Sequence, residues 1–179
     1  MALHRGWLHD MTSTAHFSIT AVAGRAYVPF LRRSLTRIGQ QVRIPPGLSF
    51  ALVGDAMMSN LHGQFLSIPG PTDVLTFELD YDARGWVISG EVIVCVPEAR
   101  RQAKRHGTKV GHELLLYCLH GLLHLTGYDD LDDAAHRKMH RAEDRILTAI
   151  GIGPVFRPAL PVQKKSTKKL TKKKESPRR

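Results

Sequence analysis

The strongest constraint on the fold comes from a run of mainly apolar residues, 109–125, that contains His120 and His124. Apolar side chains fall on nearly all sides of a helix drawn through this run, and such a helix is a buried one. No apolar stretch in the chain reaches the roughly 18 residues that a membrane span needs. The sequence therefore predicts a buried helix that carries two histidines.

The spacing of these histidines predicts a metal site. Four residues nearly complete a helical turn, so both imidazoles lean over one face. Gly127 can adopt the left-handed conformation that ends a helix, which lets the chain return Asp130 toward the rings. Two imidazole nitrogens and one carboxylate oxygen around an open position form a catalytic zinc site. We expect one zinc ion per chain, with His120, His124 and Asp130 as its ligands and a hydrolytic reaction as its chemistry.

Other interpretations of these residues stay open. Spacing alone is weak evidence, because the chain has ten histidines and a second pair, His136 and His140. The second pair lies in a charged stretch, and we interpret it as a solvent-exposed face. A core pair satisfied by hydrogen bonds is the alternative for the first, since an unmade buried hydrogen bond costs about 1–3 kcal/mol. The alternatives to Asp130 as third ligand are the neighbouring aspartates Asp129, Asp132 and Asp133. Asp132 and Asp133 are also potential helix caps.

The segment from His120 to Asp129 resembles the signature of the YbeY family, His-Gly-x-Leu-His-Leu-x-Gly-Tyr-Asp-His. Residues 71–77 resemble the family's Pro-Thr-Asp-Val-Leu-Ser-Phe, and residues 90–94 resemble its Gly-Asp-Ile-x-Ile. The resemblance covers about residues 16–150. It implies a zinc-dependent endoribonuclease specific for single-stranded RNA, with His120 and His124 as catalytic residues. It also implies the small ribosomal subunit and its RNA as partners, with roles in maturation of the 16S rRNA 3′ end and in ribosome quality control.

The sequence departs from this family at two places. The family's third ligand is histidine, and the corresponding residue here is Asp130. Carboxylate oxygen is an accepted zinc ligand, but its charge should make a bound water less acidic. The family also has an arginine before the Pro-Thr-Asp segment that is thought to bind substrate phosphate, and Leu66 occupies that position. His62 replaces a family asparagine, and Pro69 replaces an aspartate.

These departures leave two alternatives to a nuclease. One is an RNA-associated or ribosome-associated factor with a structural zinc and no cleavage. The other is a metal-dependent hydrolase of a different substrate. A peptidase is disfavoured, because zincin proteases place their glutamate base directly after the first histidine, and this chain has Gly121 there.

The chain's net charge of +10 is concentrated at one end. Residues 163–179 contain seven lysines, two arginines and one glutamate, a net charge of +8, which leaves +2 for the rest. We expect residues 156–179 to form a disordered basic tail that attracts RNA by counterion release, although a solubilising extension explains them too. Only two cysteines are present, and residues 1–10 contain no secretory apolar region. We therefore expect a cytoplasmic protein without a membrane anchor.

Residue patterns predict one α+β domain over 16–155, after a loosely ordered segment 1–15. The expected architecture is a mixed sheet of about four strands covered by about five helices, with a zincin-like metal helix. The strands are expected at 16–23, 48–53, 74–79 and 86–96, the last two as an antiparallel pair. The helices are expected at 25–40, 55–65, 97–106, 109–125 and 132–150.

Overall fold

The computed structural model describes residues 16–155, and the segments 1–15 and 156–179, with the predicted basic tail, lie outside the described residues. Four strands form one sheet: β1 (Phe17–Ala21), β2 (Gly47–Val53), β3 (Val74–Tyr81) and β4 (Val87–Cys95). The strand order is β1-β2-β4-β3. β1, β2 and β4 run parallel, while β3 pairs antiparallel with β4. The mixed four-stranded sheet and the antiparallel hairpin are thus confirmed.

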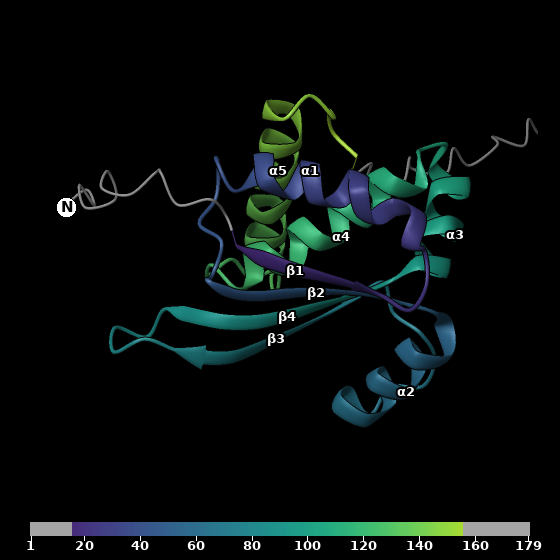
Figure 1. Ribbon diagram of the computed structural model, residues 1–179, viewed down its shortest axis with the longest axis horizontal. Coiled ribbons are helices and arrows are strands. Elements are labelled where there is room, and N and C mark those ends of the chain that lie inside the picture. Colours follow the sequence, from purple (N-terminus) through teal and green to yellow (C-terminus); the bar gives the residue numbers. More distant parts are fainter. Residues whose placement is uncertain (1–15, 156–179) are drawn as a thin grey trace, which may run out of the picture.

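Five α-helices cover this sheet, as expected for the α+β class. They are α1 (Val28–Ile38), α2 (Asp55–Leu66), α3 (Val96–His106), α4 (Val110–His124) and α5 (Asp133–Ala149). α1, α3, α4 and α5 lie on one side of the sheet, and α2 lies on the other (Figure 1). The predicted helix at 25–40 is shorter than expected, because residues Arg25–Tyr27 form a separate 3₁₀ turn, η1, before it. Among the described residues, no helix is long and apolar enough to span a membrane.

The apolar residues of α4 form the centre of the core. Leu114, Leu115, Leu119 and Leu122 have no exposed surface, and they pack in one cluster with Phe50 and other sheet residues. A smaller cluster, which includes Met58 of α2, covers part of the opposite sheet face. The central helix inferred from residues 109–125 is therefore confirmed as buried.

Gly121 lets α4 lie directly against the sheet. A Cβ atom at this position would be 2.5 Å from Val92 Cγ1 on β4 and 2.8 Å from Thr76 Oγ1 on β3. Both distances are shorter than any normal carbon contact, so a side chain here would have to displace either the helix or the Val92 and Thr76 side chains. His120 directly precedes Gly121, so this close approach also brings His120 near the sheet.

Candidate metal centre

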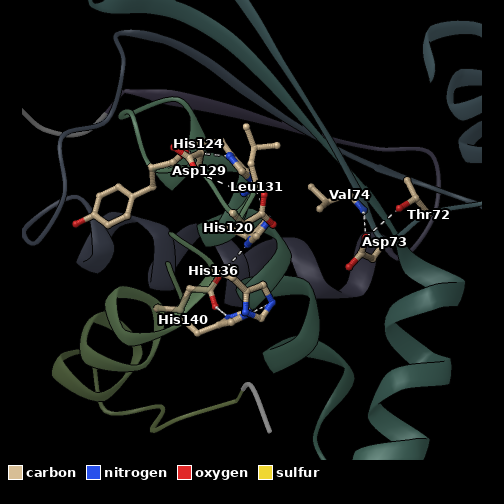
Figure 2. A network of polar contacts seen from close by, with 12 residues as sticks. Thr72, Asp73, Val74, His120, His124, Asp129, Leu131, His136 and His140 are labelled. Carbon is tan, nitrogen blue, oxygen red and sulfur yellow. Dashed lines mark hydrogen bonds and ion pairs between the residues drawn. The ribbon is translucent and has the colours of Figure 1, made fainter. Parts of the chain in front are cut away.

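His120 and His124 occupy the last turn of α4, where the helix emerges from the core. Both rings are mostly buried, with 20% and 29% of their side-chain surface exposed. Their Nε2 atoms face each other at 3.0 Å. Figure 2 shows His120 between His124 and the second histidine pair, His136 and His140. The spacing of four residues thus brings the two imidazoles together as the sequence predicts.

A tight turn after α4 brings Asp130 to the same place. Gly127 has a φ of 89°, in the left-handed region that glycine tolerates. The backbone N–H groups of Thr126 and Tyr128 donate to the carbonyl oxygen of Leu123, which closes the turn. Asp130 then places Oδ2 at 3.6 Å from His120 Nε2 and Oδ1 at 3.8 Å from His124 Nε2.

The neighbouring aspartates have other contacts. Asp132 caps α5 by accepting hydrogen bonds from the backbone N–H groups of Ala134 and Ala135, and Asp133 begins that helix. Asp129 is exposed and accepts from the backbone N–H of Leu131. Among residues 16–155, one group of three potential ligands lies close enough to hold a metal ion: His120, His124 and Asp130, whose ligand atoms all lie within 4.8 Å of one another.

Glu143 on α5 hydrogen-bonds the Nδ1 side of the His120 ring, opposite the Nε2 atom that faces His124. Its carboxylate is fully buried, and His120 Nδ1 donates to its Oε1 at 2.7 Å. Burial alone would lower the pKa of His120. The hydrogen bond and charge of Glu143, with the charge of Asp130, outweigh burial and raise this pKa above its ordinary value of 6.5. A site that attracts a proton to this ring also attracts a metal cation.

Sequence reasoning missed Glu143, although a signal was present. Met139, Ile146 and Leu147 form the inward face of α5, and position 143 lies on that same face at helical spacing. A carboxylate among apolar residues on a buried face needs a partner. The interpretation of His140 as solvent-exposed is wrong, because its side chain is only 17% exposed and its Nδ1 donates to Glu143 Oε2 at 2.5 Å. His136, its neighbour, is exposed as expected.

The hydrogen bonds around the first pair test whether a cation fits. Nδ1 of His120 faces a carboxylate, and Nδ1 of His124 faces the carbonyl oxygen of Tyr128 at 3.0 Å. Both partners can only accept, so both Nδ1 atoms carry the hydrogen and both Nε2 atoms present lone pairs. Two lone pairs at 3.0 Å repel unless a proton or a metal ion lies between them. Ligand atoms in tetrahedral zinc sites lie roughly 3.3 Å apart, and the observed separations of 3.0, 3.6 and 3.8 Å bracket that value.

His62, and Asp73 within the segment 71–77, make local hydrogen bonds. His62 Nδ1 bonds the carbonyl oxygen of Gly70 at 2.9 Å, which ties α2 to the loop before β3. Asp73 Oδ1 accepts from Thr72 Oγ1 and from the backbone N–H of Val74. Leu66 ends α2 with 54% of its surface exposed. Both Leu66 and His62 belong to α2. This helix lies across the sheet from α4 (Figure 1).

Comparison with known proteins agrees with this geometry. A family model described as Endoribonuclease YbeY matches residues 19–151. The chain is 36% identical over 139 residues to the Endoribonuclease YbeY of Thermobifida fusca, covering 70% of this chain and 90% of that protein. It is 38% identical over 123 residues to the one of Acidothermus cellulolyticus, covering 61% and 74%.

The structural comparison extends this agreement to the fold. The solution structure of TM1509 from Thermotoga maritima matches with a TM-score of 0.58 and 27% identity, covering 75% of this chain and 89% of that one. The sequence match spans both the β3–β4 hairpin and the metal helix with its turn. The chain therefore belongs to the YbeY family of endoribonucleases.

Proposed function

We propose that this protein is a zinc-dependent endoribonuclease that cleaves single-stranded RNA during ribosomal RNA maturation. The observation that carries the proposal is the pair of imidazole Nε2 atoms facing each other at 3.0 Å, with the Asp130 carboxylate beside them. Two nitrogens favour zinc over magnesium or calcium, which prefer all-oxygen sites. When bound, zinc supplies Lewis acidity and lowers the pKa of a coordinated water toward about 7.

The residues of the chain prepare the site for this chemistry. Glu143 and the Tyr128 carbonyl oxygen fix the tautomers and orientations of the two imidazoles. Asp130 adds a negative charge that a third histidine would not, so the coordinated water is less acidic than in a three-histidine site. We propose His120 and His124 as the catalytic residues, acting through the metal they hold.

We propose ribosomal RNA and the small ribosomal subunit as partners, with roles in 16S rRNA 3′ end maturation and in ribosome quality control. Family membership supports an RNA substrate. The charge of +8 over residues 163–179 supports attraction to RNA, because clustered lysines bind phosphates without reading sequence. We propose a cytoplasmic location on the same grounds, since the proposed substrate resides there.

A ribosome-associated factor with a structural zinc is the second candidate function. The exposed apolar surface around the end of α2 favours it, because Phe65, Leu66 and Ile68 are each at least half exposed where the family has a phosphate-binding arginine. The two functions predict the same bound metal and differ in whether RNA is cut.

Metal analysis combined with an RNA cleavage assay tests the proposal. The purified protein should contain one zinc ion per chain and cleave a single-stranded precursor of the 16S rRNA 3′ end. A chelator should abolish cleavage, and His124→Ala should lose both zinc and cleavage. His136→Ala, an exposed histidine outside the ligand set, is the matched control and should retain both.

The two ways of failing have different meanings. Cleavage that survives both the chelator and His124→Ala would show a contaminating nuclease and overturn the assignment. Bound zinc without cleavage of any tested RNA would establish the structural-zinc function instead.

A further inference from the structure

A pocket lies at the end of α4, and none of the three proposed ligands lines it. Its volume is about 250 Å³, and it is formed by the loop before β2, the start of β4, the turn after α4 and α5. This volume is below the roughly 300–1,000 Å³ of pockets for drug-sized ligands. The polar and aromatic groups at its wall are Gln41, Arg43, Trp86, Thr126, Tyr128 and Arg145.

The pocket is positively charged. Arg43 and Arg145 line it, and no acidic residue does. The nearest acidic influence is Asp82, whose carboxylate accepts from the backbone N–H of Trp86 and interacts with the charge of Arg43 at longer range. Within residues 16–155, neither guanidinium lies within 4.0 Å of a carboxylate. Arg43 Nη1 donates to the carbonyl oxygen of Val87 at 3.3 Å, which holds its side chain over the start of β4. Guanidinium groups without a carboxylate partner suit a phosphate, which they bind in bidentate fashion.

The same pocket presents aromatic rings. Trp86 is 41% exposed, and the ring of Tyr128 has the Lys138 ammonium 5.1 Å from its centroid. Aromatic rings beside cations are the elements with which proteins bind single-stranded nucleic acid, the rings by stacking on bases and the cations by contacting phosphates. A pocket of this size admits a base only when that base has left its stack, which excludes a base within a duplex.

The pocket and the metal centre share one residue. The Tyr128 carbonyl oxygen accepts the hydrogen bond from His124 Nδ1, while its side chain lines the pocket. Leu123, the residue before His124, also lines it. A nucleotide held here would therefore contact the same residue that orients His124.

We propose that this pocket is a nucleotide subsite that binds one unstacked base and its phosphate next to the cleavage point. The phosphate contacts Arg43 and Arg145, and the base packs against the exposed parts of the Tyr128 and Trp86 side chains. This inference rests on the proposed function, since it identifies how that site selects single-stranded RNA. Its consequence is that the chain binds single strands through a fixed site as well as through nonspecific charge.

Binding measurements without metal test the subsite independently of cleavage. The probe is a 5′-fluorescein-labelled oligouridylate of twelve nucleotides, titrated with the full chain in EDTA and followed by fluorescence anisotropy at several salt concentrations. Arg145→Ala should weaken binding and reduce the slope of log K against log salt by about 0.7, the value for one lost single-strand phosphate contact. Arg145→Lys should retain most of that slope, because the charge remains.

The aromatic variant separates stacking from charge. Tyr128→Leu keeps the backbone carbonyl that His124 needs, and it should weaken binding about tenfold with an unchanged salt slope. Arg33→Ala is the matched control, since it removes an equal charge from an exposed position on α1 outside the pocket. Residues 163–179 are present in every variant, so differences among the variants report the pocket.

Each outcome decides between the two proposals. If Arg145→Ala and Tyr128→Leu bind like Arg33→Ala while the wild type cleaves RNA, the subsite is refuted and the endoribonuclease proposal stands. If binding depends on Arg145 and Tyr128 but zinc-loaded wild type cleaves no RNA, the pocket stands as a nucleotide-binding site, while its placement next to a cleavage point fails together with the endoribonuclease proposal.

Discussion

The strongest test of the metal centre is a change at a residue that never touches the metal. Glu143 accepts hydrogen bonds from His120 Nδ1 at 2.7 Å and from His140 Nδ1 at 2.5 Å, one on each carboxylate oxygen. Glu143→Gln keeps the shape but has one acceptor oxygen instead of two. Its amide nitrogen must face one of the two rings and repel an Nδ1–H there.

The size of the effect follows from these two bonds. If the remaining oxygen faces His120, a charge-assisted bond worth about 1.5–3 kcal/mol becomes a neutral one worth about 0.5–1.5 kcal/mol. A loss of about 1–1.5 kcal/mol corresponds to about a tenfold lower affinity for zinc. If the nitrogen faces His120 instead, the ring must protonate Nε2 and cannot be a ligand, so the loss is larger. We expect zinc affinity to fall by about 10–100-fold, the range found for such supporting residues.

A competition titration against a chromophoric zinc chelator at pH 7.5 measures this affinity directly. Glu91→Gln on β4 is the control, because it makes the same chemical change away from the site. Alternate strand residues point to opposite sheet faces, and Val92 contacts α4, so Glu91 points to the other face. Thermal melting of both metal-free variants checks that they fold. An unchanged zinc affinity in a folded Glu143→Gln variant would refute the reasoning that Glu143 orients His120.

Three other predictions follow from the same geometry. Gly121→Ala should lower the free energy of unfolding by about 1–3 kcal/mol in urea titrations, because its Cβ would lie 2.5 Å from Val92 Cγ1; stability equal to wild type would contradict the close helix–sheet contact. The raised pKa of His120 should stabilise the metal-free protein below about pH 6.5, and this contribution should disappear as the pH rises through the raised value. The increase in melting temperature on adding zinc should accordingly be larger at pH 8 than at pH 6, and the opposite order would refute it. Asp130→His should retain zinc and shift the acidic limb of the cleavage pH profile to lower pH, whereas loss of zinc would show that the turn after α4 cannot position an imidazole.

The spacing of apolar residues along the chain predicted most of the helices and strands, because the same residues form the core of the folded domain. The apolar run around Leu114 and Leu122 is buried on every side, so its sequence pattern and its position in the core carry the same information. The second halves of β2 (residues 50–53) and β4 (residues 92–95) are continuous apolar runs, as expected for parallel strands covered by helices. The separate turn η1 was missed, because apolar spacing cannot distinguish a 3₁₀ start from a continuous helix.

The candidate site was only partly predictable for a related reason. His120, His124 and Asp130 lie within eleven residues, so helix geometry and one glycine turn suffice to bring them together. Glu143 and Arg43 reach the neighbourhood of α4 through tertiary packing. Helical spacing puts Glu143 on the inward face of α5, but it does not identify the partner of that carboxylate. Sequence reasoning thus found the proposed ligands and missed the side chains that support and surround them.

The position of Glu143 has a consequence for how the protein is made. A nascent chain that ends before α5 already contains all three proposed ligands, but it lacks the carboxylate that orients His120. We expect such a chain to hold a metal ion more weakly than the complete domain, because full affinity requires α5 to be docked against α4. If the domain cleaves RNA as proposed, its activation then follows the synthesis of α5.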